Sequence, residues 1–218
     1  MLEIRQTKDG SNTVYNSDLD TTYHSSWGAL QESMAVFIEN GLKAFSVLPQ
    51  PLRILEIGFG TGLNAWLSWM ECMKQPDLTL EYTGIEPFPV NREIWSVLEY
   101  AQSGFQDFKR LHEIIPGERK QLDLRFSTCI FNEQFETVQF QNKFDLIYYD
   151  AFDPATQPEL WNDEMMKKCA DLLSPGGIWV SYCSKGDVRR ALQNSGLEVR
   201  KLKGPPGKRH ILQAVKPL

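Results

Sequence analysis

The chain has 218 residues, 42% of them hydrophobic, and a net charge of −5, which suits one large domain or one domain with an appendage. No apolar run reaches the length of a membrane span, and the charged N-terminal stretch lacks the apolar core of a secretory signal. The four cysteines form no Cys-x-x-Cys pair, and three histidines are too few for a metal cluster. The composition therefore argues against a membrane protein, a disulfide framework and a metal site, and predicts a cytoplasmic protein with reduced thiols.

Residues 1–48 are predicted to form an N-terminal appendage made of a hairpin and a helix. Apolar and polar residues alternate on both sides of residues 8–11, which is typical of a β-hairpin. The helix is predicted from an apolar stripe at helical spacing, formed by Leu30, Met34, Phe37, Ile38 and Leu42. Pro49 and Pro51 then separate this appendage from a second unit, residues 49–218.

From residue 53 onward, short apolar strands alternate with helical patterns. The predicted strands are 53–57, 80–85, 122–126, 144–149, 177–182, 197–203 and 209–215, and the predicted helices are about 62–74, 90–101, 159–173 and 186–195. This alternation predicts a mostly parallel sheet with helices on both faces. The last two strands are joined only by "GPPGK", which is too short for a parallel crossover. The sequence therefore predicts an α/β, Rossmann-like fold whose seven-stranded sheet ends in an antiparallel hairpin.

Three glycines at alternate positions, in "LEIGFGTGLNAW", follow the first strand of that sheet and open a helix, which favours a nucleotide-like ligand. Residues 60–65 match the dinucleotide pattern G-x-G-x-x-A. Glu56, Gly58, Gly60 and Gly62 instead match the signature of class I S-adenosylmethionine (AdoMet) methyltransferases. The second interpretation uses all three glycines and explains Glu56, which can orient the loop and meet the ammonium of a methionine moiety. A purely structural turn is the third alternative.

Two further positions concern the nucleoside part of such a ligand. Glu86 ends the second strand, where a carboxylate can accept both ribose hydroxyls; AdoMet and NAD both need this. The predicted third strand is followed by Ser127-Thr128-Cys129, where methyltransferases often place an acid that takes the adenine amino group. Thr128 is therefore a candidate cofactor contact, and the missing acid is a departure from the usual pattern.

The candidate reacting end of the site is "YYDAFDPATQPELW". Asp150 ends the fourth strand, at the edge where open α/β sheets bind ligands. Its carboxylate can position a substrate amine and accept the proton of that amine. Phe152 can offer an apolar face to a base or to a sulfonium cation. The alternative is that Asp150 and Asp153 are only turn residues before a helix.

Positive charge is concentrated near the C-terminus. Residues 185–209 contain eight Lys/Arg and two acids, so this segment is strongly basic while the rest of the chain is acidic. Such asymmetry can mark a nucleic-acid-binding face on an acidic body. A solvated surface helix and hairpin is the alternative.

Five stretches in order, "TTYHSSWGALQES", "LEIGFGTGLNAW", "YYDAFDPATQPELW", "SYCSKGDVRRAL" and "GPPGKRH", resemble the methyltransferase domain of the bacterial tRNA 5-methylaminomethyl-2-thiouridine methyltransferases, the MnmC type. This resemblance covers nearly the whole chain and implies AdoMet-dependent methylation of the exocyclic amine of 5-aminomethyluridine at the tRNA wobble position. Some members of the family carry an additional FAD-dependent oxidase domain. This chain has no second glycine fingerprint, so it resembles the stand-alone form.

The resemblance also implies roles for the two ends of the chain. The family places the segment containing Tyr23, His24 and Ser25 beside the cofactor. The loop "GPPGKRH" and the start of the helix in "SYCSKGDVRR" are expected at the ligand-binding edge of the sheet, so their basic side chains can contact tRNA phosphates while a flipped base enters the site. The candidate tRNA contacts are Lys185, Arg189, Lys208 and Arg209.

Two rival functions stay open at this point. Aminopropyltransferases of the spermidine synthase type share the predicted sheet and a similar Asp-x-x-Asp-Pro after the fourth strand, but they have no use for a basic rim. A non-catalytic AdoMet-binding subunit is the other alternative, against which Glu56, Glu86 and Asp150 argue.

Overall fold

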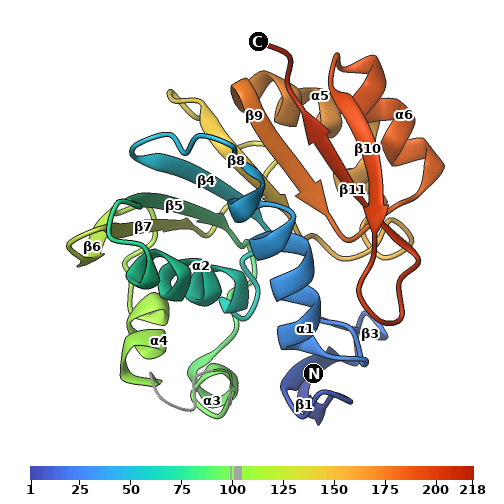
Figure 1. Ribbon diagram of the computed structural model, residues 1–218. Helices are drawn as coiled ribbons and strands as arrows, with labels where there is room; N and C mark the ends of the chain where they lie inside the picture. The colour runs from blue at the N-terminus through green and yellow to red at the C-terminus, as the bar shows by residue number, and fades with distance from the viewer. Residues whose placement is uncertain (99, 101–104) are drawn as a thin grey trace.

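The computed structural model describes residues 1–98, 100 and 105–218, and its main element is an eight-stranded sheet (Figure 1). Five neighbouring strands are parallel: β9 (Leu173–Ser181), β8 (Phe144–Tyr149), β4 (Leu52–Ile57), β5 (Leu80–Ile85) and β7 (Phe126–Phe131). Three antiparallel connections complete the sheet, with β11 (His210–Val215) against β9, β10 (Glu198–Lys203) at one edge, and β6 (Lys120–Asp123) at the other. The Rossmann-like α/β fold predicted from the sequence is confirmed.

Helices cover both faces of the sheet, as Figure 1 shows. In Figure 1, one face carries α2 (Leu63–Lys74), the short α3 (Arg92–Trp95) and α4 (Phe105–His112), and the other carries α5 (Asp163–Leu172) and α6 (Gly186–Asn194). The short η3 (Pro158–Trp161) packs in the same core as α5 and α6. Each face has its own apolar core, one centred on α2 and the other on α5 and α6. The parallel strands are therefore buried on both sides, which explains their nearly continuous apolar sequences.

The N-terminal hairpin is present, with β1 (Leu2–Gln6) antiparallel to β2 (Asn12–Asn16) and a short third strand, β3 (Thr21–Thr22), beside β2. The predicted helix begins as α1 (Ala29–Ser33), continues as the π-helix η1 (Met34–Glu39), and is followed by the short η2 (Leu42–Ala44). Phe37 of η1 is buried in the same core as α2, so the appendage packs directly on the sheet. The division at residues 48 and 49 stays a prediction.

The prediction of a seven-stranded sheet with a third strand at 122–126 is wrong. The segment forms a β-hairpin, in which β6 ends at Asp123 and the parallel strand β7 runs from Phe126 to Phe131. The turn contains Leu124, whose side chain is 95% exposed and cannot lie inside a buried strand. The sequence hides this turn because it contains neither glycine nor asparagine, the usual residues of a tight hairpin.

Two predicted helices also differ from the structure. The helix predicted at 90–101 is only the short α3, and residues 99 and 101 lie outside the described part of the chain. The helix predicted at 159–173 is divided into η3 and α5, because the Asn162 side chain accepts a hydrogen bond from the Met165 N–H and caps a new helix. The helix α4 has no counterpart among the predicted elements.

Loops at the carboxyl ends of the parallel strands bring distant segments together. The strand β10 runs parallel to β9, so the loop between β10 and β11 emerges at this same edge of the sheet. Within the described residues, no helix is long and apolar enough to cross a membrane.

Candidate active site

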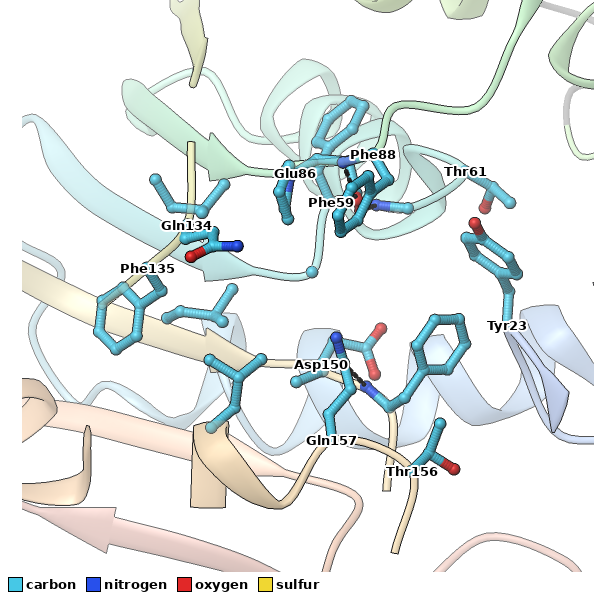
Figure 2. A pocket seen from close by; sticks show the side chains of 18 of the residues that line it. Tyr23, Phe59, Thr61, Glu86, Phe88, Gln134, Phe135, Asp150, Thr156 and Gln157 are labelled. Atoms are coloured by element: carbon cyan, nitrogen blue, oxygen red, sulfur yellow. Dashed lines mark hydrogen bonds between the residues drawn. The ribbon is translucent and has the colours of Figure 1, made fainter. Parts of the chain in front are cut away.

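A cavity of about 330 Å³ lies at the carboxyl ends of β4, β5 and β8. Figure 2 shows its side chains, with Glu86 and Phe88 on one side of the hollow and Asp150 and Gln157 on the opposite side. Its walls come from five segments: the N-terminal segment, and the segments after β4, β5, β7 and β8. This is the edge where the sequence predicts a ligand.

The glycine loop after β4 has the conformation that its glycines allow. Gly58 and Gly60 have φ angles of +87° and +52°, in the left-handed region that side chains disfavour. A Cβ atom at Gly58 would lie 2.5 Å from the carbonyl oxygen of Asp150, so the loop packs closely against the end of β8. A Cβ atom at Gly60 would lie 3.1 Å from the Tyr23 ring. Gly62 is the left-handed N-cap of α2.

Glu86 lines the cavity at the end of β5 and is held by two backbone donors. The Gly60 N–H donates to one carboxylate oxygen at 2.8 Å, and the Phe88 N–H donates to the other at 3.0 Å. Burial raises the pKa of Glu86 to about 7, against the lowering effect of these two hydrogen bonds. The predicted ribose-binding carboxylate thus links the glycine loop to the end of β5.

Glu56 is completely buried and does not line the cavity. Asn64 Nδ2 donates to Glu56 Oε1 at 2.8 Å, and the Tyr82 hydroxyl donates to Oε2 at 2.8 Å. Burial raises the pKa of Glu56 to about 8. Both carboxylate oxygens are engaged by protein groups, so this geometry gives no support to the prediction that Glu56 meets a ligand ammonium.

Asp150 lies in the wall of the cavity directly after β8. Its backbone N–H donates to the Ile57 carbonyl at 2.8 Å, and its Oδ2 accepts from Asn64 Nδ2 at 2.8 Å. Burial raises the pKa of Asp150 well above its ordinary value, and the neighbouring Glu56 carboxylate adds to this effect. The predicted reacting carboxylate is thus desolvated, oriented and able to take up a proton.

Phe152 and Tyr23 close the cavity from opposite segments of the chain. Their rings pack edge to face with centroids 5.0 Å apart. The Phe152 backbone N–H donates to the Gln157 side chain, and its carbonyl accepts from the Trp161 indole at 2.7 Å. Phe152 therefore lies in a fixed loop and presents its ring to the cavity.

The N-terminal segment reaches the cavity through Tyr23 and His24 but not through Ser25. His24 is buried, and desolvation lowers its pKa to about 4, so its imidazole is neutral at physiological pH. Ser25 lies outside the cavity lining: its backbone N–H donates to Glu32, and its hydroxyl accepts from the Trp27 N–H. Ser25 therefore orders the segment and makes no contact with the cavity.

The structure gives no support to the expectation that Thr128 contacts the cofactor, because the third parallel strand is later than predicted. Thr128 lies in the middle of β7, is fully buried and does not line the cavity. The residues that follow the strand and line the cavity are Gln134, Phe135 and Glu136. Gln134 could not be found from the sequence for the same reason. The predicted third strand ends at residue 126, so the candidate adenine contact is expected directly after it instead of after Phe131.

The four predicted tRNA contacts differ in how free their side chains are. Lys208 Nζ lies 3.1 Å from Glu32 Oε1 and 4.2 Å from the centroid of the Tyr182 ring, so it is engaged within the protein. Lys185 is exposed, with its Nζ 3.9 Å from Asp153 Oδ1, and Arg189 is half-buried. Arg209 is exposed in the loop between β10 and β11.

The cavity as a whole has carboxylates on two opposite walls, aromatic rings at its rim and a glycine-rich loop in its lining. Buried carboxylates favour a ligand that carries positive charge, because a cation restores the charge balance lost on desolvation. Within the described residues, three buried polar atoms of the lining have no hydrogen-bond partner: His24 Nδ1, Thr61 Oγ1 and Asn64 Oδ1. The site can therefore bind a cationic, nucleoside-like ligand through polar contacts that the protein itself leaves unmade.

Comparison with known proteins identifies the family. A family model described as "S-adenosyl-L-methionine-dependent methyltransferase" matches residues 94–217. The tRNA 5-methylaminomethyl-2-thiouridine biosynthesis bifunctional protein MnmC of Delftia acidovorans is 31% identical over 216 residues, covering 93% of this chain and 33% of that protein. The protein of the same name from Idiomarina loihiensis is 30% identical over 218 residues, covering 90% of this chain and 36% of that protein. The chain thus spans about a third of the length of these curated relatives.

Solved structures agree with this assignment. MnmC2 from Aquifex aeolicus is 27% identical and superposes with a TM-score of 0.79, covering 100% of this chain and 73% of that chain. Spermidine synthase from Thermotoga maritima, 17% identical with a TM-score of 0.54 over 98% of this chain and 71% of that one, shares the fold alone. The MnmC-type methyltransferase domain expected from the sequence is confirmed, and the chain belongs to the family of S-adenosyl-L-methionine-dependent methyltransferases.

Proposed function

We propose that this protein transfers a methyl group from AdoMet to the exocyclic amine of 5-aminomethyl-2-thiouridine, or of 5-aminomethyluridine, at the wobble position of tRNA. The observation that carries the proposal is the desolvated carboxylate of Asp150, held in the cavity wall by Asn64 at the end of β8. The similarity to MnmC proteins over more than 90% of the chain supports the same substrate.

The cavity residues fit AdoMet. Gly60 puts no side chain into the cavity, and Glu86 would accept from the two ribose hydroxyls. Gln134 and Phe88 stand beside the end of β7 and the end of β5, where they would contact the adenine. His24 Nδ1, as a neutral imidazole nitrogen, would contact the polar methionine end. AdoMet supplies, when bound, a methyl group on a sulfonium sulfur that an amine can attack.

In the proposed mechanism Asp150 receives the substrate amine. A primary alkylamine is mostly protonated near neutral pH, and an ammonium has no lone pair with which to attack. The arriving ammonium favours ionisation of Asp150, and the raised pKa of this carboxyl makes it a stronger base than an exposed aspartate. Asp150 thus holds the nitrogen, accepts its proton and leaves the lone pair free, while Phe152 and Tyr23 limit the access of water.

The tRNA would lie over the rim formed by the loop between β10 and β11 and the start of α6. Arg209 and Lys185 are exposed basic side chains at this rim, and they would contact phosphates. Lys208 acts differently in this proposal, because its ion pair with Glu32 fixes the loop against the N-terminal helix. A single base would enter the cavity while the backbone of the RNA stays on the rim.

The test of this function is product analysis. Purified protein is incubated with AdoMet and with tRNA from cells that lack the activity, and the digested nucleosides are identified by mass spectrometry. The proposal predicts conversion of the 5-aminomethyl nucleoside to its methylamino form. A parallel incubation with decarboxylated AdoMet and putrescine tests the aminopropyltransferase alternative, and transfer of an aminopropyl group there with no nucleoside product would overturn the proposal.

A further inference from the structure

Asn64, on the first turn of α2, joins two acidic side chains, one within β4 and one directly after β8. Its Nδ2 donates to Glu56 Oε1 at 2.8 Å and to Asp150 Oδ2 at 2.8 Å. An amide nitrogen carries two hydrogens, so both are used, and only this orientation of the amide presents donors to both carboxyls. Asn64 is thus the bridge between the buried Glu56 and the cavity-facing Asp150.

The Glu56 end of this bridge is fixed. Glu56 is 0% exposed, and its second oxygen accepts from the Tyr82 hydroxyl at 2.8 Å. Tyr82 is itself fully buried in β5, within the apolar core. Because neither neighbour can rotate without leaving a buried polar group unpaired, Glu56 holds the amide of Asn64 in one orientation.

The Asp150 end of the bridge faces the cavity. Asn64 occupies Oδ2 of Asp150, and no protein group among the described residues donates to the other oxygen, Oδ1. The amide oxygen of Asn64 is also buried in the cavity lining without a partner. One acceptor atom of Asp150 and one of Asn64 therefore have no protein donor, and Glu56 fixes the orientation of the Asn64 amide.

We propose that Asn64 is a positioning residue for methyl transfer, which holds the Asp150 carboxylate in line for the substrate amine and is itself held by Glu56. The inference rests on the proposed function, because it assigns Asp150 to the amine. It also gives Glu56 a different role from the one expected from its sequence motif: Glu56 acts through Asn64 on the reacting carboxylate and does not touch the cofactor.

The test is a double-mutant cycle in single-turnover methyl transfer, with Asn64→Ala, Asp150→Asn and the double variant. Loss of alignment alone is worth about 10²-fold in rate, so we expect Asn64→Ala to slow the chemical step by roughly that factor. In the Asp150→Asn background the same change should cost less than about threefold, because residues that act together are not additive. AdoMet affinity, measured by calorimetry, should change less than the rate in Asn64→Ala.

The matched control is Ser68→Ala. Ser68 lies one turn after Asn64 on α2, and its replacement removes a buried hydrogen bond to Tyr148 but leaves the hydrogen bonds of Asn64 intact. This variant should react at the parent rate. If Asn64→Ala does not fold, Asn64→Asp provides a second test. The aspartate side chain has the size of asparagine but donates a hydrogen bond only when its carboxyl group is protonated. Its rate deficit relative to the parent should shrink as the pH falls.

The outcomes separate the two proposals. Full additivity in the cycle, or in the second test a deficit of Asn64→Asp that is independent of pH, would overturn the positioning role while leaving the proposed function in place. An Asp150→Asn variant as fast as the parent would overturn the assignment of the amine to Asp150 and the positioning role that rests on it. Absence of the methylamino nucleoside with the parent protein would instead overturn the proposed function.

Discussion

The Tyr23 ring packs edge to face against the Phe152 ring, with their centroids 5.0 Å apart. Tyr23 follows β3 in the N-terminal segment, and Phe152 lies in the loop after β8. Their contact therefore joins two segments of the cavity lining that are distant in sequence. Tyr23 is also the neighbour that a Cβ atom at Gly60 would meet. One aromatic ring thus contacts both the glycine loop and the loop that carries Asp150, which explains how the N-terminal segment completes the site.

Removal of this ring should impair methyl transfer more than removal of its hydroxyl. We expect Tyr23→Ala to reduce kcat/KM by at least about 10-fold, because the loss of the ring opens the cavity to water and releases Phe152. Tyr23→Phe, the matched control, should keep most of the activity, since the edge-to-face contact needs only the ring. Steady-state kinetics with aminomethylated tRNA checks both, and equal losses in the two variants would show that the hydroxyl is what matters.

Gly60 should be required for cofactor affinity. Its φ of +52° disfavours any side chain, and a methyl group there would press on Tyr23 and narrow the cavity. We expect Gly60→Ala to weaken AdoMet binding by more than about 10-fold. This loss comes in addition to the conformational strain of a non-glycine residue with positive φ, which is roughly 1–2 kcal/mol. Gly117→Ala is the control, because Gly117 has a similar φ of +80° with no atom within 4 Å of the added carbon. Calorimetry that finds unchanged affinity in Gly60→Ala would contradict the assignment of the loop.

Glu86 should make AdoMet binding depend on pH. Its pKa in the free protein is raised to about 7, and the ribose hydroxyls need the ionised carboxylate as acceptor. Affinity should therefore be lower below pH 7 and rise to a plateau above it. The Glu86→Gln variant cannot ionise at this position, so its affinity should lack this rise with pH. The ratio of parent to variant affinity should therefore grow as the pH rises through about 7. A ratio that stays constant from pH 6 to pH 8 would contradict the role of Glu86.

The exposed Arg209 should contribute a phosphate contact to tRNA binding. Arg209→Glu is expected to weaken binding and to reduce the slope of log K against log salt by about 0.9 for each phosphate that the protein no longer neutralises. Lys120→Glu makes the same change of charge at the opposite edge strand, β6, and should leave the slope unchanged. Filter binding over a range of salt concentrations compares the two, and equal slopes in all three proteins would favour a solvated basic surface.

The parts of the fold and the site that depend on local pattern could be predicted from the sequence. The bounds of β5 and β8 agree with the prediction, because these strands are buried apolar runs between clear breaks. The glycine loop, Glu86 and Asp150 line one cavity, because they end or follow parallel strands whose carboxyl ends share an edge.

The parts that depend on contacts distant in sequence could not be predicted. The turn at Leu124 lacks the usual turn residues, so the pattern predicts a strand across the turn and puts Thr128 after its end, although Thr128 lies inside β7. Asn64 lies 86 residues from Asp150, and its role follows only from their hydrogen bond in the folded chain. The charge count likewise could not reveal that Lys208 is engaged by Glu32.

The central claim is that Asp150 receives the amine that attacks the methyl group, and the most direct measurement is single-turnover methyl transfer to aminomethylated tRNA against pH, in the parent and in Asp150→Asn. The parent should form the methylamino nucleoside. The variant should keep AdoMet binding but react roughly 10²–10⁴-fold more slowly near neutral pH, the usual contribution of a positioned acid–base group. Part of this loss should be recovered at higher pH, where more of the amine is already neutral. A variant that reacts at the parent rate throughout the pH range would contradict the account.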